Sequence, residues 1–313
     1  MSGRGHESLA HDAFVYGSDD EFLAGAVPFV RDAVAAGEPV LVAPTSANLA
    51  LLRGELGPEA EGVDWADEPE SHTPLQRLGI FKRFIGRHVG RGTGRVRLLG
   101  EPAWPENSPA GVAEWKRYES FLNVALAPHP VWLVCPYDVR VLADDIVGDA
   151  RHTHPTMRHC NGREASPGYV EPLDFARRLD EAVPFHPPPS GALEQAFGEA
   201  GAVRSFVVEQ AHAAGVEHPR VEDVRLAVSE IATNVFRHAG SLARVKTWRA
   251  PRAFVCEVGD DGPGVEDPFA GYVVPDPTQE GGWGLAIARQ VCDVLELRAG
   301  PVGTTVRLHF RLA

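Results

Sequence analysis

The chain has 313 residues, of which 44% are hydrophobic and 23% charged, a balance that is typical of a globular protein and excludes a disordered or fibrous one. Because one hydrophobic core seldom organises a chain of this length, we expect two domains. The formal net charge is −13, and acidic residues outnumber basic ones both before and after Ser190, so a nucleic-acid partner is not expected for either part.

The four cysteines form no CxxC pair, which argues against a zinc or redox motif, and we expect single buried thiols. They are Cys135, Cys160, Cys256 and Cys292. No apolar run approaches the roughly 20 residues of a membrane span, and the chain does not start like a secretory signal. The sequence therefore predicts a cytoplasmic protein with no membrane partner.

In the first 180 residues, short runs rich in valine and leucine alternate with longer amphipathic stretches. The near-continuous apolar character of the runs predicts strands that are buried on both faces. These strands are expected at 39–44, 95–100 and 130–138. Helices are expected around 21–36, 75–88 and 112–126. The alternation predicts an α/β domain over residues 1–180 with a mainly parallel sheet.

Residues 181–191, EAVPFHPPPSG, contain three consecutive prolines, which neither continue a helix nor donate hydrogen bonds to a sheet. We predict a linker here and a second domain over 192–313. Its helices are expected at 202–214, 221–239 and 284–295, and its strands at 243–249, 252–259 and 304–312. The last strand shows strict alternation of apolar and polar residues. This order predicts an α+β domain in which helices cover a mixed, largely antiparallel sheet.

The stretch SEIATNVFRHAG, residues 229–240, places Glu230 and Asn234 four residues apart on a predicted helix. This spacing points a carboxylate and an amide the same way, and Arg237 lies on the same flank of the apolar face. A polar flank is ordinary for a surface helix, so the motif is weak by itself.

A second segment follows a predicted strand directly and has the pattern DxGxG, formed by Asp260, Gly262 and Gly264. Glycines at a strand end allow a ligand to approach the backbone, and an aspartate there can accept a hydrogen bond from an exocyclic amine. A simple β-turn would explain the glycines but not the whole pattern.

A third segment, GGWGLAIARQ at 281–290, opens a predicted helix with Gly281, Gly282 and Gly284. The free N–H groups and the positive end of the helix dipole at such a start suit phosphate oxygens. A glycine-rich helix start is also common without a ligand.

In their order and spacing, these segments resemble the N, G1, G2 and terminal motifs of the GHKL ATPase superfamily, which includes gyrase B, histidine kinases and anti-sigma-factor serine kinases. The resemblance rests on Glu230, Asn234, Asp260, Gly262, Gly264, Gly282, Gly284, Leu285, Gly303 and Thr304. ExxxNxxRHA at 230–239 and the short lid between Asp267 and Gly281 resemble most the anti-sigma-factor serine/threonine kinases, which regulate stress and sporulation sigma factors. The resemblance covers 192–313 and implies the GHKL (Bergerat) ATP-binding sandwich.

The resemblance implies ATP and Mg²⁺ as ligands and gives three side chains separate roles. Asn234 would hold Mg²⁺ through its amide oxygen, since hard cations select oxygen ligands. Glu230 would be the general base for the attacking hydroxyl. Asp260 would bind the amino group of adenine.

Four further parts complete the implied nucleotide site. Thr304 would support Asp260 through a water molecule, and the backbone amides at 282–285 would contact phosphate. Arg237 and His238 would add positive charge near the phosphates, although a purely structural role explains these two residues better.

Before the linker, three segments resemble the MEDS sensory domain, which has a RecA-like or KaiC-like α/β fold and often precedes an anti-sigma kinase domain. They are HDAFVYGSDDEF and its continuation at 11–44, CPYDVRVLADD at 135–145 and HTHP at 152–155. The resemblance spans about residues 9–170. No GxxxxGK[ST] P-loop occurs in the chain, so nucleotide hydrolysis by this part is not expected, and the ligand that it senses stays unknown.

Several side chains of this part could line a ligand or metal pocket, and His152 and His154 have a metal-like spacing. The candidates are His11, His72, Tyr137, Asp138, His152 and His154. Because HTHP is equally typical of a loop after a helix, we favour the interpretation without a metal. His72 is not expected to accept phosphate, because Thr73 and Pro74 follow it and proline allows at most a helix start there.

The sequence therefore predicts an ATP-dependent serine/threonine kinase under the control of a sensory domain. It would control a sigma factor by binding it, or by phosphorylating its STAS-domain anti-anti-sigma antagonist. Two alternatives stay open: a sensor histidine kinase, which would autophosphorylate on histidine, and an ATP-gated binding protein without transfer activity. The family resemblance suggests a homodimer, while the sequence leaves the oligomeric state open.

Overall fold

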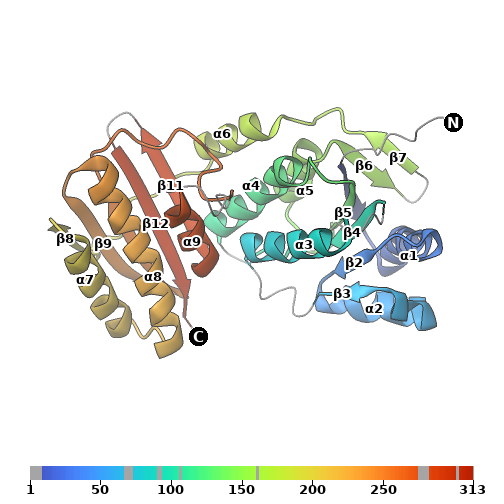
Figure 1. Cartoon of the computed structure of the whole chain (residues 1–313), viewed down its shortest axis with the longest axis horizontal. Coiled ribbons are helices and arrows are strands. Elements are labelled where there is room, and N and C mark those ends of the chain that lie inside the picture. Colours follow the sequence, from blue (N-terminus) through green and yellow to red (C-terminus); the bar gives the residue numbers. More distant parts are fainter. Residues whose placement is uncertain are drawn as a thin grey trace. The chain divides into compact units, whose positions relative to one another are not determined.

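The computed structural model describes residues 9–66, 73–89, 94–105, 108–159, 162–273, 282–300 and 303–312 (Figure 1). The chain divides into two compact units. The first consists of Met1–Ser108 and Trp115–Phe175, and the second of Pro109–Glu114 and Ala176–Ala313. None of the helices in the described ranges is long and apolar enough to cross a membrane.

The first unit is built on a seven-stranded sheet with the order β3-β2-β4-β5-β1-β6-β7. The neighbouring strands are parallel, except that β7 runs antiparallel to β6. The strands are β1 (Ala10–Tyr16), β2 (Val40–Ala43), β3 (Asp64–Trp65), β4 (Val96–Gly100), β5 (Val131–Asp138), β6 (Thr156–His159) and β7 (Gly162–Ala165). The predicted α/β class with a mainly parallel sheet is confirmed.

Helices alternate with these strands, and α6 follows the last of them. The helices are α1 (Asp19–Ala36), α2 (Ser46–Leu56), α3 (Pro74–Val89), α4 (Pro109–Ala125), α5 (Asp144–Thr153) and α6 (Pro172–Ala182), with a 3₁₀ turn at Gly57–Gly62. The sequence predicts α1, α3 and α4. Helix α1 shows clear end signals: the Ser18 hydroxyl accepts a hydrogen bond from the backbone N–H of Glu21, and Gly37 ends the helix in the left-handed conformation.

Strand β1 is one of the elements that the sequence does not predict, although it pairs in parallel with both β5 and β6. The polar residues His11 and Asp12 interrupt its apolar run, yet their exposed fractions are only 1% and 0%. A central strand that buries a histidine and an aspartate departs from the apolar pattern on which the prediction of parallel strands rests.

The second unit contains a five-stranded sheet with the order β11-β12-β10-β9-β8. Its strands are β8 (Leu193–Phe197), β9 (Ala243–Ala250), β10 (Ala253–Gly259), β11 (Val294–Gly300) and β12 (Gly303–Arg311). Every pair in the described residues is antiparallel, so the predicted α+β class is confirmed, while the expectation of a mixed sheet is wrong.

Three helices pack on this sheet: α7 (Ala200–Ala213), α8 (His218–Asn234) and α9 (Trp283–Val291) (Figure 1). Val203 of α7, Ile231 of α8 and Ala288 of α9 join Val245 and Leu308 of the sheet in one buried core. The apolar face predicted for the helix around the Glu230 motif is therefore the face that contacts the sheet.

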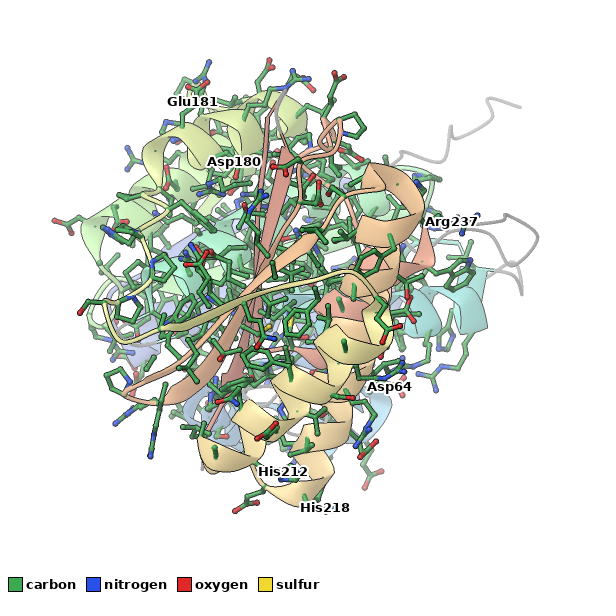
Figure 2. The ribbon with its side chains drawn as sticks, turned by 90° about the vertical axis from the view of Figure 1, so that its left-hand side faces the viewer. Asp64, Asp180, Glu181, His212, His218 and Arg237 are labelled. Atoms are coloured by element: carbon green, nitrogen blue, oxygen red, sulfur yellow. The ribbon has the colours of Figure 1, made fainter. Side chains whose placement is uncertain are left out.

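Two predicted helix boundaries are wrong in the second unit. Helix α8 ends at Asn234 and continues as a π-helical turn over Val235–Ala239, which Gly240 closes in the left-handed conformation. Helix α9 ends at Val291 and not at residue 295, because the chain from Val294 onward pairs with β12 as strand β11. Figure 2 shows His218 and Arg237 at opposite ends of the stretch formed by α8 and the π turn.

Candidate functional site

Glu230 and Asn234 lie one turn apart on α8, and both side chains face the first turn of α9. A Cβ atom placed on Gly284 would lie 2.9 Å from Nδ2 of Asn234 and 3.3 Å from Oε2 of Glu230. A residue with a side chain would therefore overlap the amide group at this position. The fold brings the predicted carboxylate, amide and glycine together at one place, with Glu230 and Asn234 half-buried.

Asp260 follows β10 and is held by the backbone on both sides. Its Oδ1 atom accepts hydrogen bonds from the N–H groups of Gly262 (2.8 Å) and Thr304 (3.4 Å), and its own N–H donates to the carbonyl oxygen of Thr304 (2.9 Å). Within the described ranges no donor bonds its second oxygen, Oδ2. The backbone thus fixes the orientation of the carboxylate and leaves one acceptor for another molecule.

Thr304 supports Asp260 directly through its backbone, where the resemblance implies a contact through water. The strand register explains this contact, since β10 and β12 pair so that Gly259 lies opposite Thr305. Any side chain on Gly303, whose φ is +142°, would overlap the backbone carbonyl group of Asp260. The start of β12 therefore requires glycine, because any side chain there would overlap the backbone of Asp260.

The two glycines of the DxGxG segment are also explained by close packing. A Cβ atom on Gly262 would lie 2.7 Å from Cβ of Ala239, the last residue of the π turn. Gly264 has a φ of +81°, and its Cβ would lie 2.5 Å from the carbonyl oxygen of Gly300. These glycines let the loop pack against the end of the helix and against β11, which positions Asp260 beside both.

Helix α9 begins after Gly282, which adopts the left-handed conformation with a φ of +82°. Leu285 in its first turn is half-buried against the core, and Gly271 approaches it so closely that a Cβ on Gly271 would lie 2.8 Å from Cβ of Leu285. The side chain of Leu285 has a packing role, and only its backbone is a candidate for ligand contact. Gly281 lies outside the described residues.

Arg237 and His238 both lie in the π turn and are exposed. Neither side chain forms a hydrogen bond or ion pair with the portion of the chain that the structure describes. Such π-helical turns are frequent at functional sites, and this one follows Asn234 immediately. The predicted cationic side chains therefore stand at the same end of α8 as Glu230 and Asn234, open to solvent.

The sequence does not point to Arg244, although this residue fastens the Asp260 loop. Its guanidinium group forms two hydrogen bonds of 2.8 Å with the carboxylate of Asp261 and one of 3.3 Å with the carbonyl oxygen of Asp260. The Arg244 hydrogen bonds lower the pKa of Asp261 below its ordinary value. The feature that identifies Arg244 is the register of β9 and β10, in which this residue lies opposite Gly259.

The first unit holds a separate cluster of buried polar side chains: His11, Glu119, Cys135 and His154. Four of their atoms, one from each residue, all lie within 4.8 Å of one another. Only His11 and His154 belong to the predicted pocket, and Cys135 is not the isolated thiol that the sequence suggests.

Of the other predicted members, Tyr137 lies beside this cluster, while Asp138 and His152 lie elsewhere. His152 is exposed and contacts Asp149 (3.1 Å), while Asp138 binds Arg140. Tyr137 packs its ring edge against His154, with 5.6 Å between ring centroids. His72 and Cys160 lie outside the described residues, whereas Cys256 and Cys292 are buried free thiols, as expected.

Comparisons with known proteins assign both parts of the chain. Residues 10–155 match the family described as the MEthanogen/methylotroph, DcmR Sensory domain (MEDS), and residues 193–310 match the family described as the histidine kinase-like ATPase domain. No match was found among the curated proteins.

Among solved structures, the chain is similar to the RsbU and RsbW domains of Rv1364c from Mycobacterium tuberculosis. The sequence identity is 23%, the TM-score is 0.30, and the match covers 40% of this chain and 33% of that chain. The match thus spans a third of the length of that protein's chain, and a likeness this weak carries no argument about fold or function. The two family matches stand by themselves: a match to the MEDS sensory domain is followed along the chain by a match to the histidine kinase-like ATPase domain.

Proposed function

We propose that the second unit is a Mg²⁺-dependent protein serine/threonine kinase that uses ATP to phosphorylate a STAS-domain partner and thereby controls a sigma factor. The observation that carries the proposal is the approach of Glu230 and Asn234 to Gly284 at the start of α9. It puts a carboxylate and an amide oxygen beside the N–H groups of a helix start. Phosphoryl transfer asks a protein mainly for positioning and charge neutralisation, which these groups supply.

The donor set suits ATP and Mg²⁺. The amide oxygen of Asn234 is a hard ligand of the kind that Mg²⁺ prefers, and the free N–H groups at the start of α9 suit phosphate oxygens. Oδ2 of Asp260 is an acceptor suited to the exocyclic amino group of adenine. Bound Mg²⁺ would neutralise phosphate charge, with Arg237 and His238 as further sources of positive charge.

Glu230 is proposed as the general base. The hydroxyl oxygen of a partner serine or threonine attacks the γ-phosphorus of ATP, the bond to the bridging oxygen of ADP breaks, and the hydroxyl proton passes to the Glu230 carboxylate. The products are ADP and a phosphorylated partner. The position of Glu230 next to Asn234 supports this role, since base and metal ligand must act on the same phosphoryl group.

The partners and the organisation of the chain are proposed from the sequence motifs. ExxxNxxRHA at 230–239 resembles the anti-sigma-factor kinases, and the sensory domain would regulate the kinase. We assign the sensory domain to 1–180, the linker to 181–191 and the kinase to 192–313, in a cytoplasmic homodimer.

The test is to incubate the full-length chain with radiolabelled ATP, Mg²⁺ and the STAS-domain proteins of its own organism. Acid-stable label on a STAS protein, lost in Glu230→Gln, supports the proposal. Acid-labile label on the chain itself would replace it by a histidine kinase. ATP binding with no label on any partner would replace it by a nucleotide-gated binding protein.

A further inference from the structure

We propose that the first unit binds one Zn²⁺ ion through Nε2 of His11, Nε2 of His154, Sγ of Cys135 and a carboxylate oxygen of Glu119, named here the buried tetrad. This site is independent of the proposed kinase activity. All four residues are at most 2% exposed, and they come from four separate places in the chain.

The topology of the first unit explains how the buried tetrad assembles. His11 and Cys135 lie on the neighbouring parallel strands β1 and β5, where the register places His11 opposite Leu133, two residues before Cys135. Side chains two residues apart on a strand share a face, so both residues point to the same side of the sheet. Glu119 comes from α4, and His154 stands directly after α5.

Three distances within the buried tetrad are close to those of a tetrahedral zinc site, and the remaining ones are at most 4.8 Å. Oε2 of Glu119 lies 3.2 Å from Nε2 of His154 and 3.8 Å from Nε2 of His11, which in turn lies 3.4 Å from Sγ of Cys135. Ligand atoms at the usual bond lengths of about 2.0–2.3 Å around a tetrahedral Zn²⁺ are about 3.3–3.6 Å apart. The side chains thus need only small movements to coordinate an ion.

The outer nitrogen of His154 is fixed by hydrogen bonding. Its Nδ1 lies 2.8 Å from the carbonyl oxygen of Ala150, which only accepts, so Nδ1 carries the proton. The Nε2 lone pair therefore points into the buried tetrad. A histidine that donates its other N–H to a carbonyl group is the usual arrangement of a zinc ligand.

The tautomer of His11 follows from the same reasoning. Nδ2 of Asn123 donates to the carbonyl oxygens of Ser120 (3.2 Å) and Thr153 (2.7 Å), which leaves Oδ1 of Asn123 as the atom 3.0 Å from Nδ1 of His11. Because Oδ1 accepts, Nδ1 of His11 donates, and the Nε2 lone pair also points into the buried tetrad. Two histidines are thus oriented as ligands by different partners.

Without a cation, the buried tetrad leaves two buried polar atoms without a hydrogen bond. Nε2 of His154 and Oε2 of Glu119 lie 3.2 Å apart, yet both are buried atoms without a hydrogen-bond partner in the described residues. An unpaired buried polar atom is costly. A cation between them satisfies both, and two neutral histidines, one thiolate and one carboxylate balance the charge of Zn²⁺.

A cavity of about 450 Å³ reaches the edge of the buried tetrad and offers a path for the ion. His11 and its partner Asn123 both line this cavity, together with Arg163 and Tyr169. A zinc site needs such a route in addition to its ligands.

The experiment titrates Co²⁺, a spectroscopic substitute for Zn²⁺, into the reduced, metal-free full-length chain. The expected result is one equivalent with the intense visible bands of tetrahedral Co²⁺, a near-ultraviolet thiolate-to-cobalt band, and displacement of both by one equivalent of Zn²⁺. An oxygen-ligand site such as that proposed at Asn234 produces no thiolate band, so the two sites are distinguishable.

Variants identify the ligands. Cys135→Ser is expected to remove the thiolate band, and His154→Gln to weaken Co²⁺ binding at least about tenfold. The controls Cys256→Ser and His152→Gln change a buried thiol and an exposed histidine outside the buried tetrad and are expected to leave the spectrum unchanged. The proposal is overturned if the wild-type chain, folded by circular dichroism, gives no tetrahedral Co²⁺ spectrum, or if folded Cys135→Ser retains the thiolate band.

Discussion

The amide group of Asn234 and the backbone of Gly284 are so close that a methyl group on residue 284 would lie 2.9 Å from the Asn234 nitrogen. This contact ties the end of α8 to the start of α9, two segments that are about 50 residues apart in the sequence. It converts two separate sequence motifs into one wall of the candidate nucleotide site.

Gly284→Ala is the most specific test of that contact. The added methyl group displaces the Asn234 amide, and a misplacement of about 1 Å near reacting groups lowers rates on the order of a hundredfold. We expect this loss in phosphoryl transfer to the STAS partner, measured with radiolabelled ATP. Gly201→Ala in α7 is the matched control, because its Cβ would meet only the Arg204 side chain at 3.9 Å, and its rate should match the wild type.

Asp260→Asn tests the recognition of adenine. The backbone N–H of Gly262 holds the side-chain oxygen, so the new NH₂ group takes the place of Oδ2 and faces the amino group of ATP. We expect a loss of ATP affinity of about tenfold to a hundredfold, typical of a hydrogen bond to a charged group. Affinity for GTP, whose O6 is an acceptor, should fall less.

Asp64→Asn serves as the control for Asp260, since it changes the same residue type at an exposed position in the first unit. Calorimetry should give the wild-type ATP affinity. If both variants bind ATP equally well, Asp260 does not recognise adenine.

Glu230→Gln separates binding from chemistry. The amide keeps the size of the side chain but cannot take the hydroxyl proton, so transfer should fall by about a hundredfold to ten-thousandfold while ATP still binds. Glu222→Gln, on the same helix and exposed beside Arg225, should retain full activity. Equal transfer rates in the two variants would exclude Glu230 as the base.

Removal of zinc should destabilise the first unit. A ligand that binds only the folded state stabilises it by about 4 kcal/mol when its free concentration is 1,000 times Kd. Differential scanning calorimetry of the full-length chain should therefore show a lower unfolding temperature after chelation. In Cys135→Ser the chelator should have a much smaller effect, and an equal effect in both proteins would contradict zinc binding by the buried tetrad.

The sequence predicts the elements whose local pattern agrees with their final environment. The strands β2, β4 and β5 are nearly continuous apolar runs, and β12 alternates, because one pattern suits a sheet covered on both faces and the other a sheet covered on one. Strand β1 escapes prediction because its buried His11 and Asp12 are explained only by tertiary partners: Asp12 accepts hydrogen bonds from Trp132 and Arg163.

The candidate nucleotide site and the buried tetrad also differ in how far the sequence predicts them. The nucleotide motifs are short segments whose spacing is visible in the sequence, so Glu230, Asn234 and Asp260 could be predicted, whereas Arg244 follows only from strand register. The ligands of the buried tetrad come one by one from distant elements, and no spacing links Cys135 to Glu119 before the chain is folded.

Isothermal titration calorimetry of ATP with Mg²⁺, on the wild-type chain and on Asn234→Ala, measures whether α8 and α9 form a Mg²⁺-dependent nucleotide site. We predict saturable binding by the wild type that weakens when Mg²⁺ is omitted, and a loss of this Mg²⁺ dependence in Asn234→Ala. Thr233→Ala changes an exposed neighbour whose hydroxyl donates to the backbone carbonyl of Ser229, and it should behave as the wild type. No ATP binding by the folded wild-type chain, or unchanged Mg²⁺-dependent binding in Asn234→Ala, would contradict the proposed nucleotide site.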